Sequence, residues 1–189
     1  MNEVHIDCGE IYLREFRIED VDVIYEITSQ PEVYEFLPDW KTTREQRLNY
    51  VENYEIPSNN RFLAALPNIE EQTYLNLGIV LKETGEMIGF CHSGLKRALP
   101  APNREIAYGL SKFYWNQGYA TKAAKGLIDF LFERTNVEVL NAVAVLNNVG
   151  SNRVIQKCGF QLIGDVEIDG KLHHHYRLNR VDWKDKKVE

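Results

Sequence analysis

Residues 113–127, FYWNQGYATKAAKGL, set one glycine, Gly118, among aromatic and amide residues and then run directly into an alanine-rich segment. The apolar residues that follow recur at the spacing of one helix face, at Ala120, Ala123, Ala124, Leu127, Ile128 and Leu131. The first turn of a helix leaves backbone N–H groups free and carries the positive end of the helix dipole. Gly118 and Ala120 would let a ligand approach that backbone closely, and Thr121 adds a hydroxyl. The stretch therefore predicts a helix whose N-terminus receives an anion, most often a pyrophosphate.

A second explanation of this stretch is a plain strand-to-helix turn, in which Gly118 is present for steric reasons. Two other phosphate-binding loops do not fit the residues. A Walker loop needs two glycines and a Lys-Ser or Lys-Thr pair, and a Rossmann fingerprint needs three glycines in an N-terminal β-α-β unit. The choice between an anion cradle and a plain turn therefore depends on the rest of the chain.

The composition is that of an ordinary globular protein, and we expect a single domain over residues 1–189. Hydrophobic residues make up 44% and charged residues 26%. The net charge of -6 argues against a nucleic-acid partner, because phosphate binding favours a basic surface. Cys8, Cys91 and Cys158 are far apart and odd in number, so we expect no disulfide framework and a cytoplasmic location. The first residues lack the apolar core of a signal peptide, and no apolar run is long enough for a membrane span.

Before residue 113 we expect a strand, two successive helices and then an antiparallel run of strands. A strand ending near Ile18 should lead into a helix capped by Asp20 or a neighbour, and Thr42 and Glu45 stand at capping-box spacing before a second helix. Residues 57–72 are rich in Pro, Asn and Glu and are expected to form mainly loop, with residues 61–66 ambiguous. Two apolar runs around residues 82–86 predict a hairpin, and residues 103–111 predict a third strand.

The pattern after the central helix predicts a β-α-β crossover and a closing hairpin. Residues 138–147, EVLNAVAVLN, are apolar nearly throughout, as expected of a strand buried on both faces. A short helix should follow over residues 149–158, with Gly159 placed to end it. The pair Asp169-Gly170 predicts the turn of the last hairpin. Together these elements predict a mixed α/β (α+β) fold.

Two further motifs accompany the glycine stretch: REIAYGLSKFYW at residues 104–115 and NVGSNRVIQKCGF at residues 148–160. With YWNQGYATKA they resemble the GCN5-related N-acetyltransferase (GNAT) family, most closely its ribosomal-protein (RimJ/RimL-type) branch. That family has Gln/Arg-x-x-Gly-x-Gly/Ala at the helix entrance, where this chain has Trp115 in place of the Gln or Arg, as is common in the branch. The later motif is similar to Asn-x-x-Ser-x-Arg-Val-(Ile/Leu)-x-Lys-x-Gly-Phe. The resemblance covers nearly the whole chain.

The resemblance implies a mostly antiparallel sheet, flanked by helices and split to admit acyl-CoA, with acetyl-CoA as co-substrate. Backbone N–H groups near the helix entrance would hold the pyrophosphate, and the edge of residues 108–111 would pair with the pantetheine arm. Asn148 and Ser151 would border the same arm, although Asn148 could also serve only as a helix cap. The residues implied for acetyl-CoA binding are Leu110, Ser111, Trp115, Asn116, Gln117, Gly118, Tyr119, Ala120, Thr121, Asn148 and Ser151.

Acetyl transfer to an amine needs a base for the ammonium, donors for the oxyanion and modest help for the leaving thiolate. Glu105 is the candidate base, because strand alternation puts it on one face with Ala107 and the branch commonly has an acidic residue there. The alternative for Glu105 is a surface carboxylate beside Arg104. Some relatives use a tyrosine as the acid at the position of Ile155, so Ser151 or water is left as the candidate. Ser151 could instead only bond the backbone of its helix.

We expect no metal site, because His173 and His175 share a strand face but no Cys or carboxylate cluster completes a ligand set by spacing. Cys158 is expected to pack in the core. Of the early aromatic residues, one or two are expected to shape the amine pocket; they are Tyr34, Phe36, Trp40, Tyr50 and Tyr54. The predicted activity is acetyl transfer to a small-molecule amine or a protein N-terminus, by a monomer or homodimer. A non-catalytic acyl-CoA sensor is the alternative, favoured by Ile155.

Overall fold

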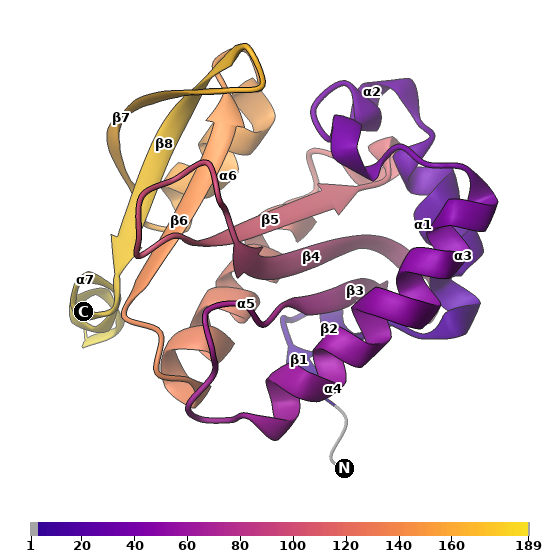
Figure 1. Ribbon diagram of the computed structural model, residues 1–189, viewed down its shortest axis with the longest axis horizontal. Coiled ribbons are helices and arrows are strands. Elements are labelled where there is room, and N and C mark those ends of the chain that lie inside the picture. Colours follow the sequence, from indigo (N-terminus) through magenta and orange to yellow (C-terminus); the bar gives the residue numbers. More distant parts are fainter. Residues whose placement is uncertain (1–3, 189) are drawn as a thin grey trace.

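The computed structural model describes residues 4–188, and these residues build an eight-stranded sheet with helices on both faces (Figure 1). The strand order is β1-β2-β3-β4-β5-β6-β8-β7, antiparallel except between β5 and β6. The strands are β1 His5–Asp7, β2 Ile11–Glu15, β3 Leu75–Leu81, β4 Met87–Leu95, β5 Arg104–Leu110, β6 Val139–Val145, β7 Gln161–Ile168 and β8 Lys171–Asn179. The α-helices are α1 Val21–Thr28, α2 Pro31–Tyr34, α3 Arg44–Tyr50, α4 Ile56–Ala64, α5 Tyr119–Arg134, α6 Val149–Lys157 and α7 Arg180–Val188. The predicted mixed, mostly antiparallel fold is confirmed.

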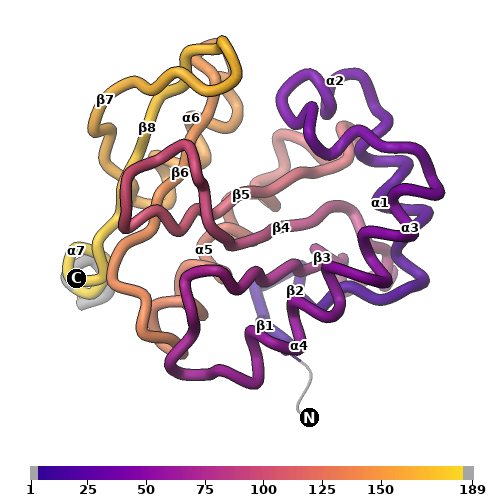
Figure 2. The backbone as a smooth tube through the Cα atoms, in the orientation of Figure 1, coloured from indigo at the N-terminus to yellow at the C-terminus, as the bar shows by residue number. Residues whose placement is uncertain are grey.

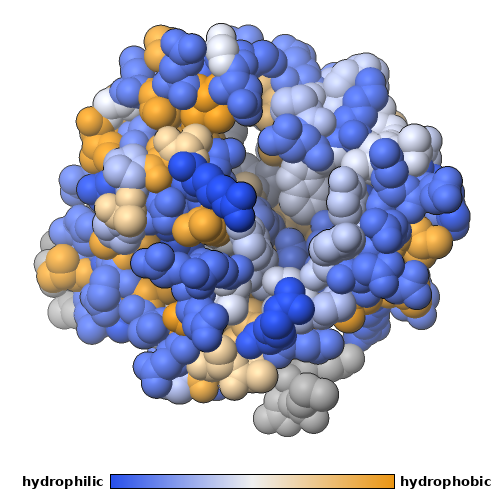
Figure 3. Space-filling view, in the orientation of Figure 1, coloured by the Kyte–Doolittle hydropathy of each residue, from blue (hydrophilic) through white to orange (hydrophobic). Residues whose placement is uncertain are grey.

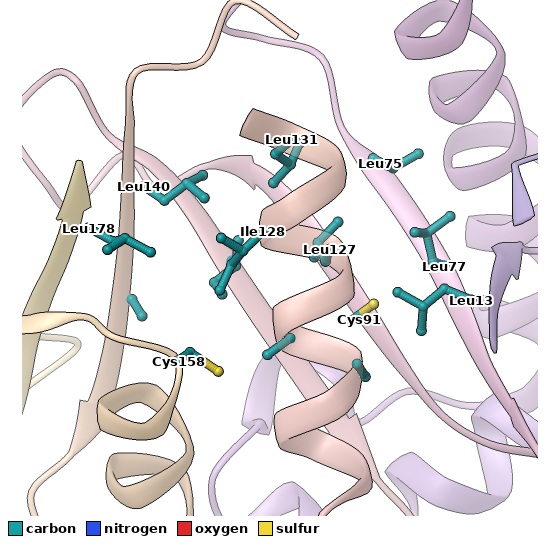
Figure 4. Close-up of a cluster of buried hydrophobic side chains, with 14 of the residues drawn as sticks. Leu13, Leu75, Leu77, Cys91, Leu127, Ile128, Leu131, Leu140, Cys158 and Leu178 are labelled. Carbon is teal, nitrogen blue, oxygen red and sulfur yellow. The ribbon is translucent and has the colours of Figure 1, made fainter. Parts of the chain in front are cut away.

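Helix α5 packs its predicted apolar face on one side of the sheet (Figure 4). Leu127, Ile128 and Leu131 project from it toward strand residues such as Leu77 and Leu140, and all five side chains are buried. Burying a leucine-sized side chain contributes about 1.5–3 kcal/mol, so this face fixes α5 firmly on the sheet. Because α5 is anchored along its length, its N-terminus is held at a fixed place beside β5.

A second, smaller core lies on the opposite face of the sheet, beneath the helices before residue 56. Ile24 and Ile27 of α1 pack there with Phe90 of β4, and the ring of Trp40 stacks on Phe90 with 4.2 Å between ring centroids. Trp40 belongs to a short 3-10 turn, η2 (Pro38–Trp40). The N-terminal helices thus build a wall that stands beside the ends of β4 and β5.

The sheet splits between its two parallel strands. β5 and β6 pair at one register position, Glu105↔Asn141, and then diverge, as the tube in Figure 2 also shows. The side chain of Asn141 holds the vertex of this split, because its Nδ2 donates to the carbonyl oxygens of Pro102 at 3.0 Å and Arg104 at 3.2 Å. The edge of β5 beyond Glu105 therefore faces an opening instead of a neighbouring strand.

Several sequence predictions of local structure are confirmed. The hairpin around residues 82–86 joins β3 to β4, the third strand is β5, and the buried strand is β6. Asp169 and Gly170 both have positive φ, 50° and 72°, as the turn of a two-residue hairpin requires. Cys158 is buried in the main core, as expected.

The expectation of a loop over residues 57–72 was wrong for its first part, where α4 forms. Its polar residues are buried against β3 by side-chain hydrogen bonds: Asn59 donates to Asn76 O and accepts from Asn76 N, and Ser58 donates to Tyr74 O. Phe62 is fully buried on the same helix. The backbone of Tyr74 and Asn76 thus satisfies the hydrogen-bonding groups of two polar side chains that the sequence suggested would contact solvent.

Other boundaries differ by a few residues from the predictions. The capping box before α3 is formed by Thr43 and Gln46, one residue later than expected. The strand expected to reach Ile18 ends at Glu15. Asp20 does stand at the N-cap of α1, but its carboxylate accepts hydrogen bonds from Arg14 and from the backbone N–H of Arg17. The short strand β1 and the terminal helix α7 were not anticipated.

Candidate functional site

A cleft of about 1090 Å³ opens where β5 and β6 separate. One wall comes from α2 and η2, the other from β6, α6 and the turn between β7 and β8, and the entrance of α5 closes one end. The space-filling view shows the surface hollowed between these two parts of the molecule (Figure 3).

None of the helices described between residues 4 and 188 combines the length and the apolar character that a membrane span requires.

The entrance of α5 has the backbone geometry of an anion cradle. Gly118 is the N-cap with φ of 82°, a left-handed conformation that glycine adopts without strain, and Asn116 is also left-handed with φ of 60°. No side chain caps the helix, and the first helical bond is donated by Lys122 to Gly118 O. The N–H groups of Tyr119, Ala120 and Thr121 therefore remain available to a ligand. A side-chain carbon placed on Gly118 would meet no atom within 4 Å, so the space beside it is open.

Most of the residues predicted to bind acetyl-CoA line this cleft. They are Leu110, Trp115, Asn116, Gly118, Tyr119, Ala120, Thr121, Asn148 and Ser151, with Glu105 at the vertex. Trp115 is fixed beneath the entrance by a hydrogen bond from Nε1 to Leu110 O, at 3.0 Å. Ser111 and Gln117 are not among the lining residues: Ser111 is buried and its hydroxyl accepts from Gln30 Nε2 at 3.0 Å, and Gln117 Nε2 donates to Phe113 O.

Asn148 and Ser151 meet at the start of α6. Asn148 caps the helix, since its Oδ1 accepts from the backbone N–H of Ser151 at 3.0 Å. The Ser151 hydroxyl lies 3.0 Å from the hydroxyl of Tyr108, which is also 3.1 Å from Ser151 O. When Tyr108 donates to Ser151 Oγ, the serine proton is free to point into the cleft. Burial raises the pKa of Tyr108, so its phenol stays protonated at neutral pH.

Glu105 is buried at the vertex of the split, with 7% of its surface exposed. Desolvation raises the pKa of its carboxyl from 4.5 to about 7, and the nearby ammonium of Lys96 partly opposes that rise. This burial does not fit the alternative of a surface carboxylate beside Arg104, whose own guanidinium extends to the carbonyl oxygens of Glu70, Glu71 and Thr73. A carboxyl group with a pKa near neutrality, open to a cleft, can exchange a proton with a bound ligand.

Aromatic and acidic side chains surround the part of the cleft beyond Glu105. Phe36, Trp40 and His92 line it, and burial lowers the pKa of His92 to about 4, so this imidazole is neutral at pH 7. The acidic lining residues from the N-terminal wall are Glu32, Glu35 and Asp39. Of the remaining aromatic candidates, Tyr50 and Tyr54 are exposed elsewhere.

The three consecutive histidines of β8 have separate partners. His173 Nδ1 contacts Lys171 O, His174 Nδ1 contacts Asp165, and His175 Nε2 contacts Asn141 Oδ1. Among the residues that the structure describes, no group of three or more His, Cys, Asp or Glu side chains is arranged to hold a metal ion.

Sequence reasoning missed the side chains of Tyr108, Lys96 and Asn141. Tyr108 was expected only as part of the strand edge along the pantetheine arm, and no local pattern pairs its hydroxyl with Ser151, 43 residues later. Lys96 follows β4 in a polar connection that carried no motif. Asn141 was a polar residue inside an otherwise apolar strand, and that interruption was the available signal.

Comparisons with known proteins agree with this geometry. Residues 10–161 match the family model described as Acetyltransferase (GNAT) domain. The chain is 24% identical over 161 residues to the uncharacterized N-acetyltransferase YnaD of Bacillus subtilis, covering 85% of each chain. Its fold is similar to that of the aminoglycoside acetyltransferase AAC(6')-Ib in complex with coenzyme A, with a TM-score of 0.74, 16% identity and coverage of 94% and 99%. It is also similar to RimL, a ribosomal-protein alpha-N-acetyltransferase, with a TM-score of 0.71, 16% identity and coverage of 95% and 96%. The chain therefore belongs to the GNAT family of acetyltransferases and is an N-acetyltransferase.

Proposed function

We propose that the protein transfers an acetyl group from acetyl-CoA to the primary amine of a small molecule or a protein N-terminus, by direct attack of the amine. The observation that carries this proposal is a buried carboxyl group, Glu105, with a pKa of about 7, at the vertex of a cleft whose far end is an anion cradle. Acetyl-CoA supplies the activated thioester. The remaining requirements fall to residues of the chain.

The entrance of α5 fits the pyrophosphate of acetyl-CoA. Three N–H groups without helical partners and an open space beside Gly118 meet there. Arg153 and Lys157 of α6 add positive charge to the cleft lining. The unpaired edge of β5, from Ile106 to Leu110, would hydrogen-bond the pantetheine arm as a neighbouring strand would. Asn148 and Ser151 would lie along the same arm.

Glu105 is the proposed general base. An alkylammonium with a pKa near 10.4 is about one part in a thousand free amine at pH 7, so its proton must be removed before attack. A carboxylate with an ordinary pKa is a poor acceptor for that proton. The raised pKa of Glu105 improves the match, directly or through one water.

Ser151 is the proposed general acid. After the amine nitrogen bonds to the carbonyl carbon and the C–S bond breaks, the thiolate needs one proton. Ser151 can give that proton and regain one from water in the open cleft, while the Tyr108 hydroxyl, hydrogen-bonded to it at 3.0 Å, holds the serine in place. Backbone N–H groups on the free edge of β5 would meet the carbonyl oxygen. The acid role that some relatives give to a tyrosine at the position of Ile155 would thus be taken by Ser151.

The acceptor is proposed to be a cationic amine because the outer cleft has acidic lining residues at 35 and 39, whereas Glu32 is already paired with Lys112 at 2.8 Å. Both a small polyamine and a protein N-terminus have this charge at neutral pH. The aromatic wall of Phe36 and Trp40 would pack against the carbon skeleton next to the amine.

The test is a screen for thiol release from acetyl-CoA across amine classes, including N-terminal peptides of ribosomal proteins. With a good acceptor, Glu105→Gln should lower kcat at pH 7 by roughly 10²- to 10⁴-fold, because the amide keeps the shape and loses the base. Acetyl-CoA affinity should be nearly unchanged, and the deficit should shrink as pH approaches the pKa of the amine. Near-normal kcat in Glu105→Gln would remove Glu105 as the base. Tight binding without turnover on any acceptor would instead indicate an acyl-CoA sensor.

A further inference from the structure

The carboxyl of Glu105 has a charged partner that the acetyl-transfer chemistry does not use. Lys96 follows β4, and its Nζ lies 3.8 Å from Glu105 Oε2. The Glu105 side chain is 10% exposed and that of Lys96 is 28% exposed, so the ammonium approaches from the wetter side of the cleft. Both residues line the cleft. The contact is therefore an ion pair at the point where an acceptor amine must arrive.

The backbone that carries Lys96 is braced. The Lys96 N–H donates to Asn103 O at 2.9 Å, and Asn103 Nδ2 donates to Lys96 O at 3.1 Å. The connection is tied to the sheet beyond it, because Asn141 Nδ2 donates to the carbonyl of Pro102. The ammonium thus extends from a fixed turn, and its distance from Glu105 is set by the fold.

Two other ionisable groups next to Glu105 on β4 and β5 supply no comparable charge. His92, on the same sheet face, is neutral at pH 7 because burial lowers its pKa to about 4. Arg104 precedes Glu105 and points away, with its guanidinium on the carbonyl oxygens of residues 70, 71 and 73.

Two ionisable groups of β8 face the same vertex from the other side of the split. His175 contacts Asn141 Oδ1 at 2.9 Å, and burial lowers its pKa, so it is neutral there. Arg177 Nε lies 3.5 Å from the same Asn141 oxygen. Asn141 therefore separates this guanidinium from Glu105. Of the side chains that the structure describes, Lys96 supplies the ammonium in ion-pair contact with the carboxylate.

We propose that Lys96 is a positioning residue that keeps the buried Glu105 carboxylate ionised, and so able to accept a proton, in the free enzyme at neutral pH. The proposal rests on the proposed role of Glu105 as the base. Without a counter-charge, a carboxyl buried this deeply would hold its own proton and could not take one from the acceptor.

The size of the effect follows from the distance. An opposite charge within about 4–6 Å lowers a carboxyl pKa by roughly 1–3. With Lys96 present the pKa of Glu105 is about 7, so about half of the enzyme is ready at pH 7. Removing the ammonium should raise that pKa by about 1, which leaves roughly a tenth ionised and lowers the rate at pH 7 about fivefold.

The first measurement is the pH titration of the Glu105 carboxyl by carbon-13 NMR, in full-length protein labelled at glutamate side chains. The resonance is assigned by its loss in Glu105→Gln. We expect the midpoint to rise by about one pH unit in Lys96→Met and to stay near the wild-type value in Lys96→Arg. Arg97→Met is the matched control, because Arg97 is the next residue, is exposed and has the same charge. An unchanged midpoint in Lys96→Met, or an equal rise in Arg97→Met, would overturn the proposal.

The second measurement is the pH profile of kcat on an acceptor from the screen. Lys96→Met should be about fivefold slower at pH 7 and converge on wild type near pH 9, with KM for acetyl-CoA unchanged and activity restored by Lys96→Arg. A deficit that is the same at every pH would mean that Lys96 has only a structural role. The NMR titration needs no acceptor, so it tests the effect of Lys96 on Glu105 by itself. A failed acceptor screen would count only against the proposed function.

Discussion

Glu105 lies in the strand REIAYGL, where its carboxyl is buried among largely apolar neighbours at the vertex of the cleft. The burial that raises the pKa of this carboxyl must also cost the protein stability when the group is ionised. The pKa is raised from 4.5 in the unfolded chain to about 7 in the folded one, so the favourable contribution is complete below pH 4.5. It is lost as pH rises through 7, and this difference corresponds to about 3 kcal/mol.

We therefore predict that Glu105→Gln is more stable than wild type above pH 7 and loses that advantage near pH 4.5. The measurement is the free energy of unfolding in urea for both proteins between pH 4.5 and pH 8. Relative to the variant, the wild type should lose about 3 kcal/mol across this range. Glu52→Gln is the control, because Glu52 is exposed. Parallel stability curves for wild type and Glu105→Gln would show that Glu105 titrates normally in the folded protein.

At the scale of elements, the split between β5 and β6 depends on one amide. Asn141 Nδ2 donates across the vertex to the carbonyl oxygens of Pro102 and Arg104, so its Oδ1 is the acceptor that faces His175. The imidazole must then carry its proton on Nε2, which agrees with its lowered pKa. Asn141 is fully buried, so each of these bonds replaces one that water would otherwise make.

Asn141→Leu should therefore lower the free energy of unfolding by about 3 kcal/mol, because buried partners are left without a hydrogen bond. A double-mutant cycle separates this from lost packing. His175→Leu should cost clearly less in the Asn141→Leu background than in wild type, because the bond between the two is already gone. Additive effects of the two substitutions would mean that the amide and the imidazole stabilise the vertex independently.

Local sequence patterns predicted the elements of the second half well for identifiable reasons. The 3.6-residue period of α5, the continuous apolar run of β6 and the Asp169-Gly170 turn are each set by residues close in sequence. Helix α4 was missed because Ser58 and Asn59 are satisfied by a strand about 17 residues away, which no local pattern shows. Lys96 was missed for the same reason: its importance lies in a distance to Glu105 across the β4–β5 connection.

Considered as a whole molecule, the protein is a sheet opened on one side, with the entrance of α5, the proposed anion cradle, at one end of the cleft and the buried carboxyl of Glu105, the proposed base, at the vertex. The cradle is the part that tests the account most directly, because the same helix entrance could be a plain turn. Gly118 permits a matched pair of substitutions there. Asn and Asp have the same size and both tolerate a left-handed backbone, and a side chain at this position meets open space.

The measurement is calorimetric affinity for acetyl-CoA in Gly118→Asn and Gly118→Asp, with S-acetylpantetheine, which lacks the pyrophosphate, as the control ligand. Because Asp places a negative charge, and Asn a neutral amide of the same size, beside the pyrophosphate, Gly118→Asp should bind acetyl-CoA at least tenfold more weakly than Gly118→Asn, about 1.4 kcal/mol, and the two should bind S-acetylpantetheine equally. Equal affinities of the two variants for acetyl-CoA would contradict the account, because the pyrophosphate would then lie away from the entrance of α5.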